Sequence, residues 1–146
     1  MTMEEKYEAL RLSNQLCFPL YAASKEVVKR YTPLLSALDL TYTQYIAMMV
    51  LWEKGEVSAK ALGDCLYLDS GTLTPVLKCL ETKGLVERRR SAEDERVLLC
   101  KITEKGVALR EKAIDVPHQM ATCVRLTPEE GQILYRLLYK LLGKEE

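Results

Sequence analysis

The feature that most constrains this sequence is a pair of short helical segments followed directly by two strand-like runs. Apolar residues at helical spacing predict helices over residues 58–66 and 71–83, joined by the three-residue turn 67–69. The runs 85–90 and 96–102 then bracket a polar connection, which indicates a hairpin. Two helices joined by a short turn are a helix-turn-helix, and a hairpin placed directly after them is a wing.

Further helices are expected before this core. The apolar spacing between Tyr7 and Tyr31 predicts one long first helix, which Pro19 complicates. The proline either kinks that helix or, if the helix begins near Phe18, occupies an accepted place in its first turn. A second helix is expected over residues 43–54.

Two more helices are expected after the hairpin. One covers residues 103–116, where Pro117 ends or bends it, and the last covers 127–143. The last helix carries a wide apolar stripe of Ile133, Leu134, Leu137, Leu138, Leu141 and Leu142. Because such a stripe exceeds what a small core needs, we expect a second copy of the chain to bury it.

These elements predict a mainly α fold with a small β-wing, formed by one domain over residues 1–146. Residues 41–102 are expected to form the winged helix-turn-helix, and the segments 1–40 and 103–146 to dimerise it. The longest apolar run is far below the roughly 18 to 20 residues that span a bilayer, and the start lacks the features of a secretion signal. We therefore expect a cytoplasmic protein with no membrane partner.

No metal and no cofactor are expected. The five cysteines form an odd set without a C-x-x-C pair, and His118 is the only histidine. This pattern argues against a disulfide framework, a zinc site and a cysteine–histidine nucleophile pair. Cys65 and Cys100 are expected to face the core.

Any attraction for DNA must come from a local patch, because 21 basic and 21 acidic residues cancel. The apolar residues of the helix 71–83 share one face, which leaves a small, hydroxyl-bearing and basic face outside. Such a face suits the major groove. We assign DNA contacts on it to Ser70, Thr72, Thr74, Pro75 and Lys78, and a solvated surface helix is the alternative.

The hairpin adds a second set of candidate DNA contacts. Arg88, Arg90 and Arg96 surround its acidic tip. An arginine at a wing tip can enter a narrow minor groove, and a neighbouring carboxylate can fix its rotamer. We assign these roles to Arg96 and Asp94, with a solvated charge cluster as the alternative.

Several motifs together resemble the MarR family, specifically its OhrR branch. They are Leu16-Cys17-Phe18, Leu20-Tyr21-Ala22, Leu40-Thr41-Tyr42, Gln44-Tyr45, the run 66–75 and Asp94-Glu95-Arg96. The resemblance implies a homodimeric repressor that binds inverted-repeat operator DNA when reduced. It implies release when an organic hydroperoxide oxidises one N-terminal cysteine, which by position is Cys17. Pro19 departs from the family pattern.

The resemblance also places tyrosine hydroxyls beside the sulfur, matching Tyr31 and Tyr42, with Tyr21 as a weaker third. Cys17 and Tyr31 are fourteen residues apart, about 21 Å along an unbroken helix, so the tyrosine is expected from the partner subunit. Oxidation in such proteins ends either in a disulfide with a second cysteine or in capture of a low-molecular-weight thiol. Cys123 lies in the region of the resolving cysteine.

Two other functions remain open at this point. A MarR-type regulator that senses a small aromatic ligand would not need Cys17. A thiol peroxidase would use the same cysteine in turnover, whereas we expect no enzyme and only stoichiometric sensing. Cys17 as a small hydrophobic core residue is the structural alternative to both.

Overall fold

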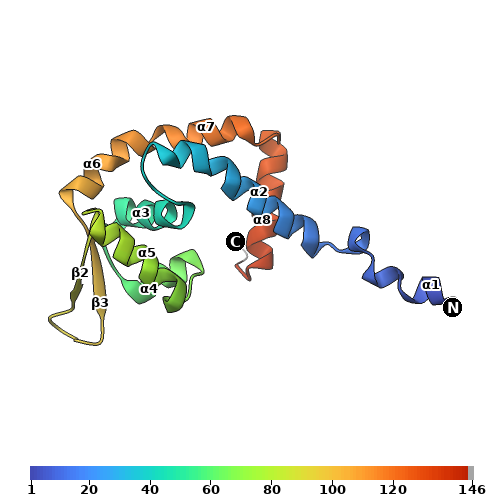
Figure 1. The fold of residues 1–146 in the computed structure, drawn as a ribbon, viewed down its shortest axis with the longest axis horizontal. Coiled ribbons are helices and arrows are strands. Elements are labelled where there is room, and N and C mark those ends of the chain that lie inside the picture. The colour runs from blue at the N-terminus through green and yellow to red at the C-terminus, as the bar shows by residue number, and fades with distance from the viewer. Residues whose placement is uncertain (145–146) are drawn as a thin grey trace.

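The computed structural model describes residues 1–144 and is built mainly from helices, with one small sheet at one end of the molecule (Figure 1). In chain order the elements are α1 (Met3–Lys6), the 3₁₀ turns η1 (Glu8–Leu10) and η2 (Leu12–Asn14), α2 (Cys17–Ser36), α3 (Tyr42–Lys54), β1 (Glu56–Ser58), α4 (Ala59–Leu66), α5 (Ser70–Thr82), β2 (Val86–Arg90), β3 (Leu98–Ile102), α6 (Glu104–Ala113), α7 (Asp115–Cys123) and α8 (Pro128–Leu141).

The helix-turn-helix consists of α4 and α5, and local hydrogen bonds fix both helix starts. The Ser58 hydroxyl accepts from the amide of Ala61 at 3.1 Å, and the Asp69 carboxylate accepts from the amide of Thr72 at 2.8 Å. Between the helices Tyr67 adopts a positive φ of 56°. A Cβ on Gly63 would lie 2.8 Å from the carbonyl oxygen of Leu68, so this close turn requires glycine.

The sheet has three antiparallel strands in the order β1-β3-β2, and β2 and β3 form the predicted wing. Strand β1 was not predicted. It has only three residues and exists because it pairs with β3, with Val57 opposite Cys100. Behind the sheet, α3, α4 and α5 enclose a core whose fully buried members include Met48, Leu51, Leu62, Leu77, Leu80 and Val86.

The prediction of one long first helix over residues 7–31 is wrong in its first half. Residues 3–14 form α1 and two 3₁₀ turns, and α2 begins at Cys17. Pro19 is therefore the third residue of α2, where a backbone N–H has no partner within the helix, so a missing N–H costs nothing. This outcome matches the second alternative for Pro19.

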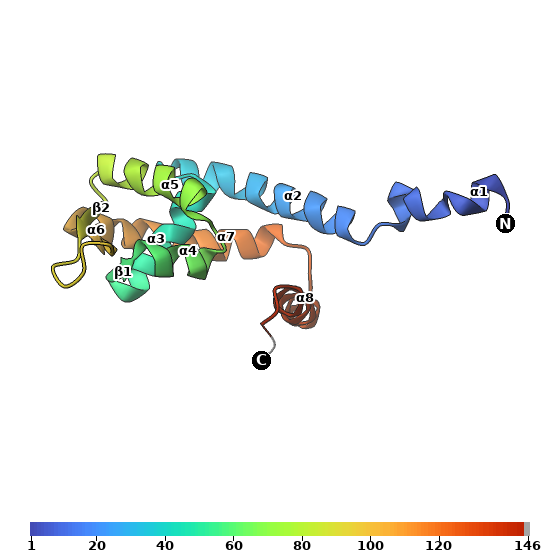
Figure 2. The same cartoon turned by 90° about the horizontal axis from the view of Figure 1, so that it is seen from below.

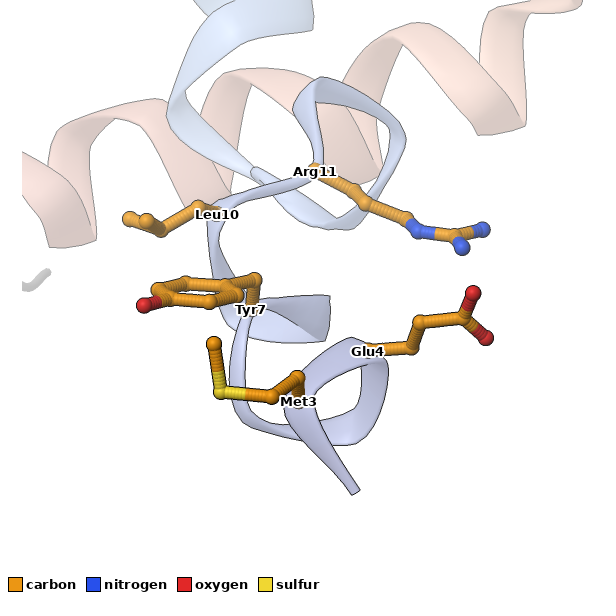
Figure 3. A pocket seen from close by; sticks show the side chains of 5 residues that line it. All are labelled: Met3, Glu4, Tyr7, Leu10 and Arg11. Carbon is orange, nitrogen blue, oxygen red and sulfur yellow. The ribbon is translucent and has the colours of Figure 1, made fainter.

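The segment before α2, here called the N-terminal arm (residues 3–16), projects away from the rest of the chain (Figure 1). None of the residues in its helical turns is buried. Figure 3 shows the side chains of Met3, Tyr7 and Leu10 together on one side of the arm, with Glu4 and Arg11 on the other. The arm is thus an exposed amphipathic segment.

The C-terminal part differs from its prediction at Pro117. Helix α6 ends at Ala113, and α7 starts at Asp115 with Pro117 as its third residue. Helix α7 packs along α2 (Figure 1). Helix α8 starts at Pro128 behind a capping box of Thr127 and Glu130, and Figure 2 shows it end-on beside the other helices. No residue of α8 is buried.

Candidate functional site

The outward face of α5 consists of the residues that the sequence assigned to it. Ser70, Thr72, Thr74, Pro75 and Lys78 are all exposed, while Leu73, Val76, Leu77 and Leu80 are buried against the core. The hydroxyl of Thr74 donates to the carbonyl of Ser70 at 2.7 Å, within the helix itself. The helix therefore presents short polar side chains and one ammonium group.

The wing tip pairs Arg96 with Asp94. The Asp94 carboxylate accepts from Nε of Arg96 at 3.1 Å and from its backbone amide at 3.0 Å. These bonds hold the pKa of Asp94 below its ordinary value. The Arg96 side chain is 91% exposed, so the pair orients a guanidinium that projects from the tip.

The three consecutive arginines of β2 have different surroundings. Arg88 lies against Glu81 of α5, with Nη2 of Arg88 3.0 Å from Oε1 of Glu81, and the Arg88 side chain is only 19% exposed. Arg89 pairs with Glu56 of β1 at 3.3 Å. Arg90 is exposed and has no ion-pair partner among residues 1–144. The geometry thus offers Arg90 and Arg96, rather than Arg88, to a bound polyanion.

Cys17 is the first residue of α2, and it is exposed. The preceding residue Leu16 supplies no side-chain cap, so the first amides of this helix are not capped within residues 1–144. Tyr21, one turn later, lies on the same helix face, and it is exposed as well. Within a single chain Cys17 is therefore not part of the hydrophobic core.

Tyr31 and Tyr42 lie together, but away from Cys17 of their own chain. Their ring centroids are 4.9 Å apart, and Tyr45 packs 5.8 Å from Tyr31. Burial raises the pKa of all three phenols above the ordinary value of 10.0, so their hydroxyls stay protonated at neutral pH. Since α2 is unbroken, Tyr31 is about 21 Å from Cys17 along its axis. One chain does not bring the predicted thiol site together.

The other cysteines have distinct environments. Cys123 ends α7 and is half-buried, and its carbonyl accepts from Arg30 of α2 at 2.9 Å. Cys100 is buried in β3, and burial raises the pKa of its thiol to about 11, which makes it inert. Cys65 is exposed, so the expectation that it faces the core is wrong.

Sequence reasoning missed the polar contacts that hold α5 in place. Lys83, just after α5, donates to the backbone carbonyl of Asp39 and to the side chain of Gln44 at 3.1 Å. Glu81 holds Arg88 of the wing. Both contacts join residues that are distant in sequence or lie across a turn, and no local pattern identifies them.

A helix-turn-helix with an exposed hydroxyl-bearing and basic second helix, beside an arginine-tipped wing, defines a winged-helix transcriptional regulator. Residues 29–113 match the family model of the SarA/Rot transcriptional regulators, and the chain belongs to this family. None of the helices within residues 1–144 is long and apolar enough to cross a membrane.

Two relatives support the OhrR-type resemblance. The chain is 50% identical over 143 residues to the organic hydroperoxide resistance transcriptional regulator of Bacillus subtilis, covering 96% of this chain and 95% of that protein. It also resembles AbfR of Staphylococcus epidermidis. The TM-score is 0.78 for reduced AbfR bound to DNA, with 33% identity over 96% of this chain and 97% of that one.

Other states of AbfR have also been solved. Overoxidised AbfR bound to DNA matches with a TM-score of 0.78, 34% identity and coverage of 94% and 97% of the two chains. The disulfide form of AbfR matches less well, with a TM-score of 0.66 at 33% identity and coverage of 97% and 99%. The conformation of the present chain is therefore closer to that of the two DNA-bound forms.

Proposed function

We propose that this protein is a homodimeric, redox-sensing repressor that acts on DNA in the cytoplasm. In this proposal the reduced dimer binds an inverted-repeat operator through α5 and the wing, and it releases the operator when an organic hydroperoxide oxidises Cys17. The observation that carries the proposal is the exposed thiol at the start of α2, on a chain whose winged helix presents a DNA-reading face.

The first chemical step needs a thiolate and a hydroperoxide. The Cys17 sulfur attacks the terminal oxygen of the hydroperoxide, and the O–O bond breaks. The thiol proton ends on the departing alkoxide, which leaves as the alcohol, and the sulfur becomes a sulfenic acid. The Cys17 thiol is exposed in the first turn of α2, where a hydroperoxide can reach it.

The second step is closure of a disulfide, for which Cys123 of the partner subunit is our candidate. Its thiol attacks the sulfenic sulfur, and water leaves. Within one chain, Arg30 contacts the Cys123 carbonyl about two thirds of the way along α2, about 20 Å along the helix from Cys17. A bridge therefore requires two subunits. A low-molecular-weight thiol is the alternative resolving group.

The dimer itself is proposed from unpartnered apolar surface. Phe18, Leu20, Val27 and Val28 of α2 are exposed, as is the stripe of α8 that includes Ile133 and Leu137. An antiparallel pairing of two α2 helices would bring Cys17 of one chain near the partner's Tyr31 and Tyr42. Their protonated hydroxyls would then be available to donate hydrogen bonds to the thiolate.

The energy that such a switch needs is small. A hundredfold loss of operator affinity corresponds to about 2.7 kcal/mol of coupling between the thiol and the DNA-reading surface. A new covalent bond between subunits can supply this by shifting one half of the dimer against the other. Overoxidised AbfR was solved on DNA, which favours the disulfide, rather than a charged sulfur, as the releasing state here.

A gel-shift experiment tests this function. Reduced protein is expected to shift an inverted-repeat DNA, cumene hydroperoxide to abolish the shift, and Cys17→Ser to bind but ignore the peroxide. Mass spectrometry of the oxidised dimer distinguishes a Cys17–Cys123 bridge from a mixed disulfide. Release of Cys17→Ser by hydroperoxide would contradict the proposal, and release by a small aromatic acid alone would favour the ligand-sensing alternative.

A turnover measurement tests the claim that sensing is stoichiometric. With excess hydroperoxide and a dithiol reductant, we expect consumption of about one equivalent per Cys17 before the reaction slows to the rate of re-reduction. Sustained rapid consumption would identify a thiol peroxidase instead.

A further inference from the structure

An ion pair between the wing and α5 uses a carboxylate on the helix that we propose reads DNA. Glu81 accepts three hydrogen bonds from Arg88: from Nε at 3.3 Å, from NH2 at 3.0 Å and from the backbone amide at 3.1 Å. A carboxylate that receives both a guanidinium fork and an amide is fixed in position and orientation. The contact therefore joins the last turn of α5 to strand β2.

The opposite face of β2 is fastened as well. Successive side chains of a strand point to opposite faces, so Arg89 projects away from α5 and pairs with Glu56 of β1. In the middle of the sheet, Arg88 lies opposite the buried Cys100. The base of the wing is thus held from both sides, whereas its tip carries the exposed Arg96.

We propose that Glu81 is a positioning residue for DNA recognition, which holds the wing through Arg88 at a fixed distance from α5. The inference rests on the proposed DNA binding. A winged helix engages the major groove with α5 and the minor groove with the wing tip at the same time, so the spacing between them must match the DNA. Glu81 and Arg88 set this spacing without contacting a base.

If electrostatics alone mattered, removal of Glu81 would change the DNA affinity in the opposite direction. The direction of the change therefore tests the inference. Glu81 is one turn away from Lys78 on α5, and a carboxylate near phosphates repels them. If Glu81 contributed only its charge, then its removal would tighten DNA binding. If Glu81 positions the wing, then its removal weakens binding to the operator although a negative charge has been lost.

The test compares Glu81→Ala, Arg88→Lys and the double variant in reduced protein, on operator and on random duplex DNA. Arg88→Lys keeps the charge but loses the planar fork that fits a carboxylate. We expect each single variant to lose about tenfold in operator affinity and less than about threefold on random DNA. The double variant is expected to lose no more than about twofold beyond either single one, because both remove the same contact.

Arg90→Gln is the matched control, because Arg90 is the exposed neighbour in the same strand. It is expected to weaken operator and random DNA alike, and to reduce the slope of log K against log salt by about 0.9, as loss of one phosphate contact does. Glu81→Ala and Arg88→Lys are expected to leave this slope unchanged. Circular dichroism spectra and melting temperatures show whether each variant is folded.

Tighter or equal operator binding by Glu81→Ala would overturn the inference and leave the proposed function intact. So would an Arg88→Lys variant that binds the operator as well as the unaltered protein does. Absence of operator binding by the unaltered reduced protein would overturn the proposed function itself, and the inference with it.

Discussion

At the scale of single residues, the tyrosine cluster shows how burial prepares a hydrogen-bond donor. Tyr31 is half-buried against Tyr42, and burial raises the pKa of both phenols. A phenol that stays protonated can donate to an anionic sulfur throughout the physiological pH range. The two tyrosine side chains are thus suited to stabilise a thiolate, although Cys17 of their own chain lies too far away to be that thiolate.

This arrangement predicts the behaviour of Tyr31→Phe. The variant is expected to bind operator DNA as the unaltered protein does, since Tyr31 belongs to α2 and not to α5 or the wing. It is expected to release DNA more slowly after addition of hydroperoxide, by roughly tenfold, because a hydrogen bond to a charged group is lost. Fluorescence anisotropy of labelled operator measures both quantities. Tyr45→Phe is the control, because Tyr45 belongs to the same cluster but is only 3% exposed. This variant is expected to release DNA after hydroperoxide addition at the normal rate.

Asp69 gives a residue-scale prediction for pH. Its carboxylate caps α5, and hydrogen bonds from Thr72 hold its pKa below the ordinary 3.8. A lowered pKa in the folded state means that the ionised cap stabilises the protein fully above about pH 4, and that this contribution disappears as the pH falls through the lowered value. Asp69→Asn keeps an acceptor but does not titrate.

The expected result is a difference in melting temperature between the two proteins that is constant at neutral pH and shrinks below about pH 4. Thermal melts followed by circular dichroism between pH 3 and 7 measure it. A difference that grows as the pH falls would contradict the assignment of Asp69 as the ionised cap.

At the scale of elements, the packing of α6 on the sheet depends on one glycine. A Cβ on Gly106 would lie 2.4 Å from the carbonyl oxygen of Leu85 and 2.7 Å from the Ile102 side chain. The Gly106 carbonyl also accepts from the indole of Trp52 at 2.8 Å. Helix α6 can therefore lie this close to the wing only without a side chain at this position.

Gly106→Ala is expected to lower the free energy of unfolding by about 2–3 kcal/mol, because backbone must move to admit the methyl group. Gly131→Ala is the matched control. It also lies within a helix, but a Cβ there would meet nothing within 4 Å, so a gain of about 0.5–1 kcal/mol is expected. Urea unfolding curves give both values. Equal effects of the two substitutions would contradict the packing argument.

The elements also show what a sequence can and cannot predict. Ser58, Thr103 and Thr127 begin helices as predicted, because a cap is a contact over three residues. Strand β1 was missed because only its pairing with the distant β3 makes it a strand. The first half of the predicted 7–31 helix was wrong because apolar spacing alone does not form a helix that has nothing to pack on.

The same reasoning applies to the candidate site. The exposed face of α5 followed from helical periodicity, and the Asp94–Arg96 pair from two residues that are close in sequence. The contacts of Glu81, Arg89 and Lys83 depend on how the strands and helices pack, which periodicity does not reveal. Hence Arg88, which the sequence assigned as a DNA contact, is paired with the Glu81 carboxylate, and its guanidinium is not free.

At the scale of the whole molecule, the exposed apolar surface of α8 is the basis of the proposed dimer. Leu137 is in the middle of the stripe, and it is exposed in the single chain. Leu137→Glu would place an unpaired carboxylate in the proposed interface, which costs several kcal/mol. The variant is expected to raise the dimer dissociation constant by at least about a hundredfold and to lose operator binding with it.

Sedimentation equilibrium and gel shifts measure these two effects. Gln132→Glu, a change at an exposed polar position on the other face of the same helix, is the control and is expected to remain dimeric. A Leu137→Glu protein that stays dimeric at nanomolar concentration would show that α8 is not in the interface.

Helix α2 is continuous from Cys17 to Ser36, so in the proposed antiparallel twofold pair the two sulfurs lie at opposite ends of the paired helices. Each then meets the oxidant independently of the other. A dimer stays fully reduced only when neither of its two Cys17 thiols has reacted. The fraction of fully reduced dimers therefore equals the square of the fraction of unreacted Cys17. If oxidation of one subunit is enough for release, two separate sensors make the response begin at about half the dose that one sensor would need.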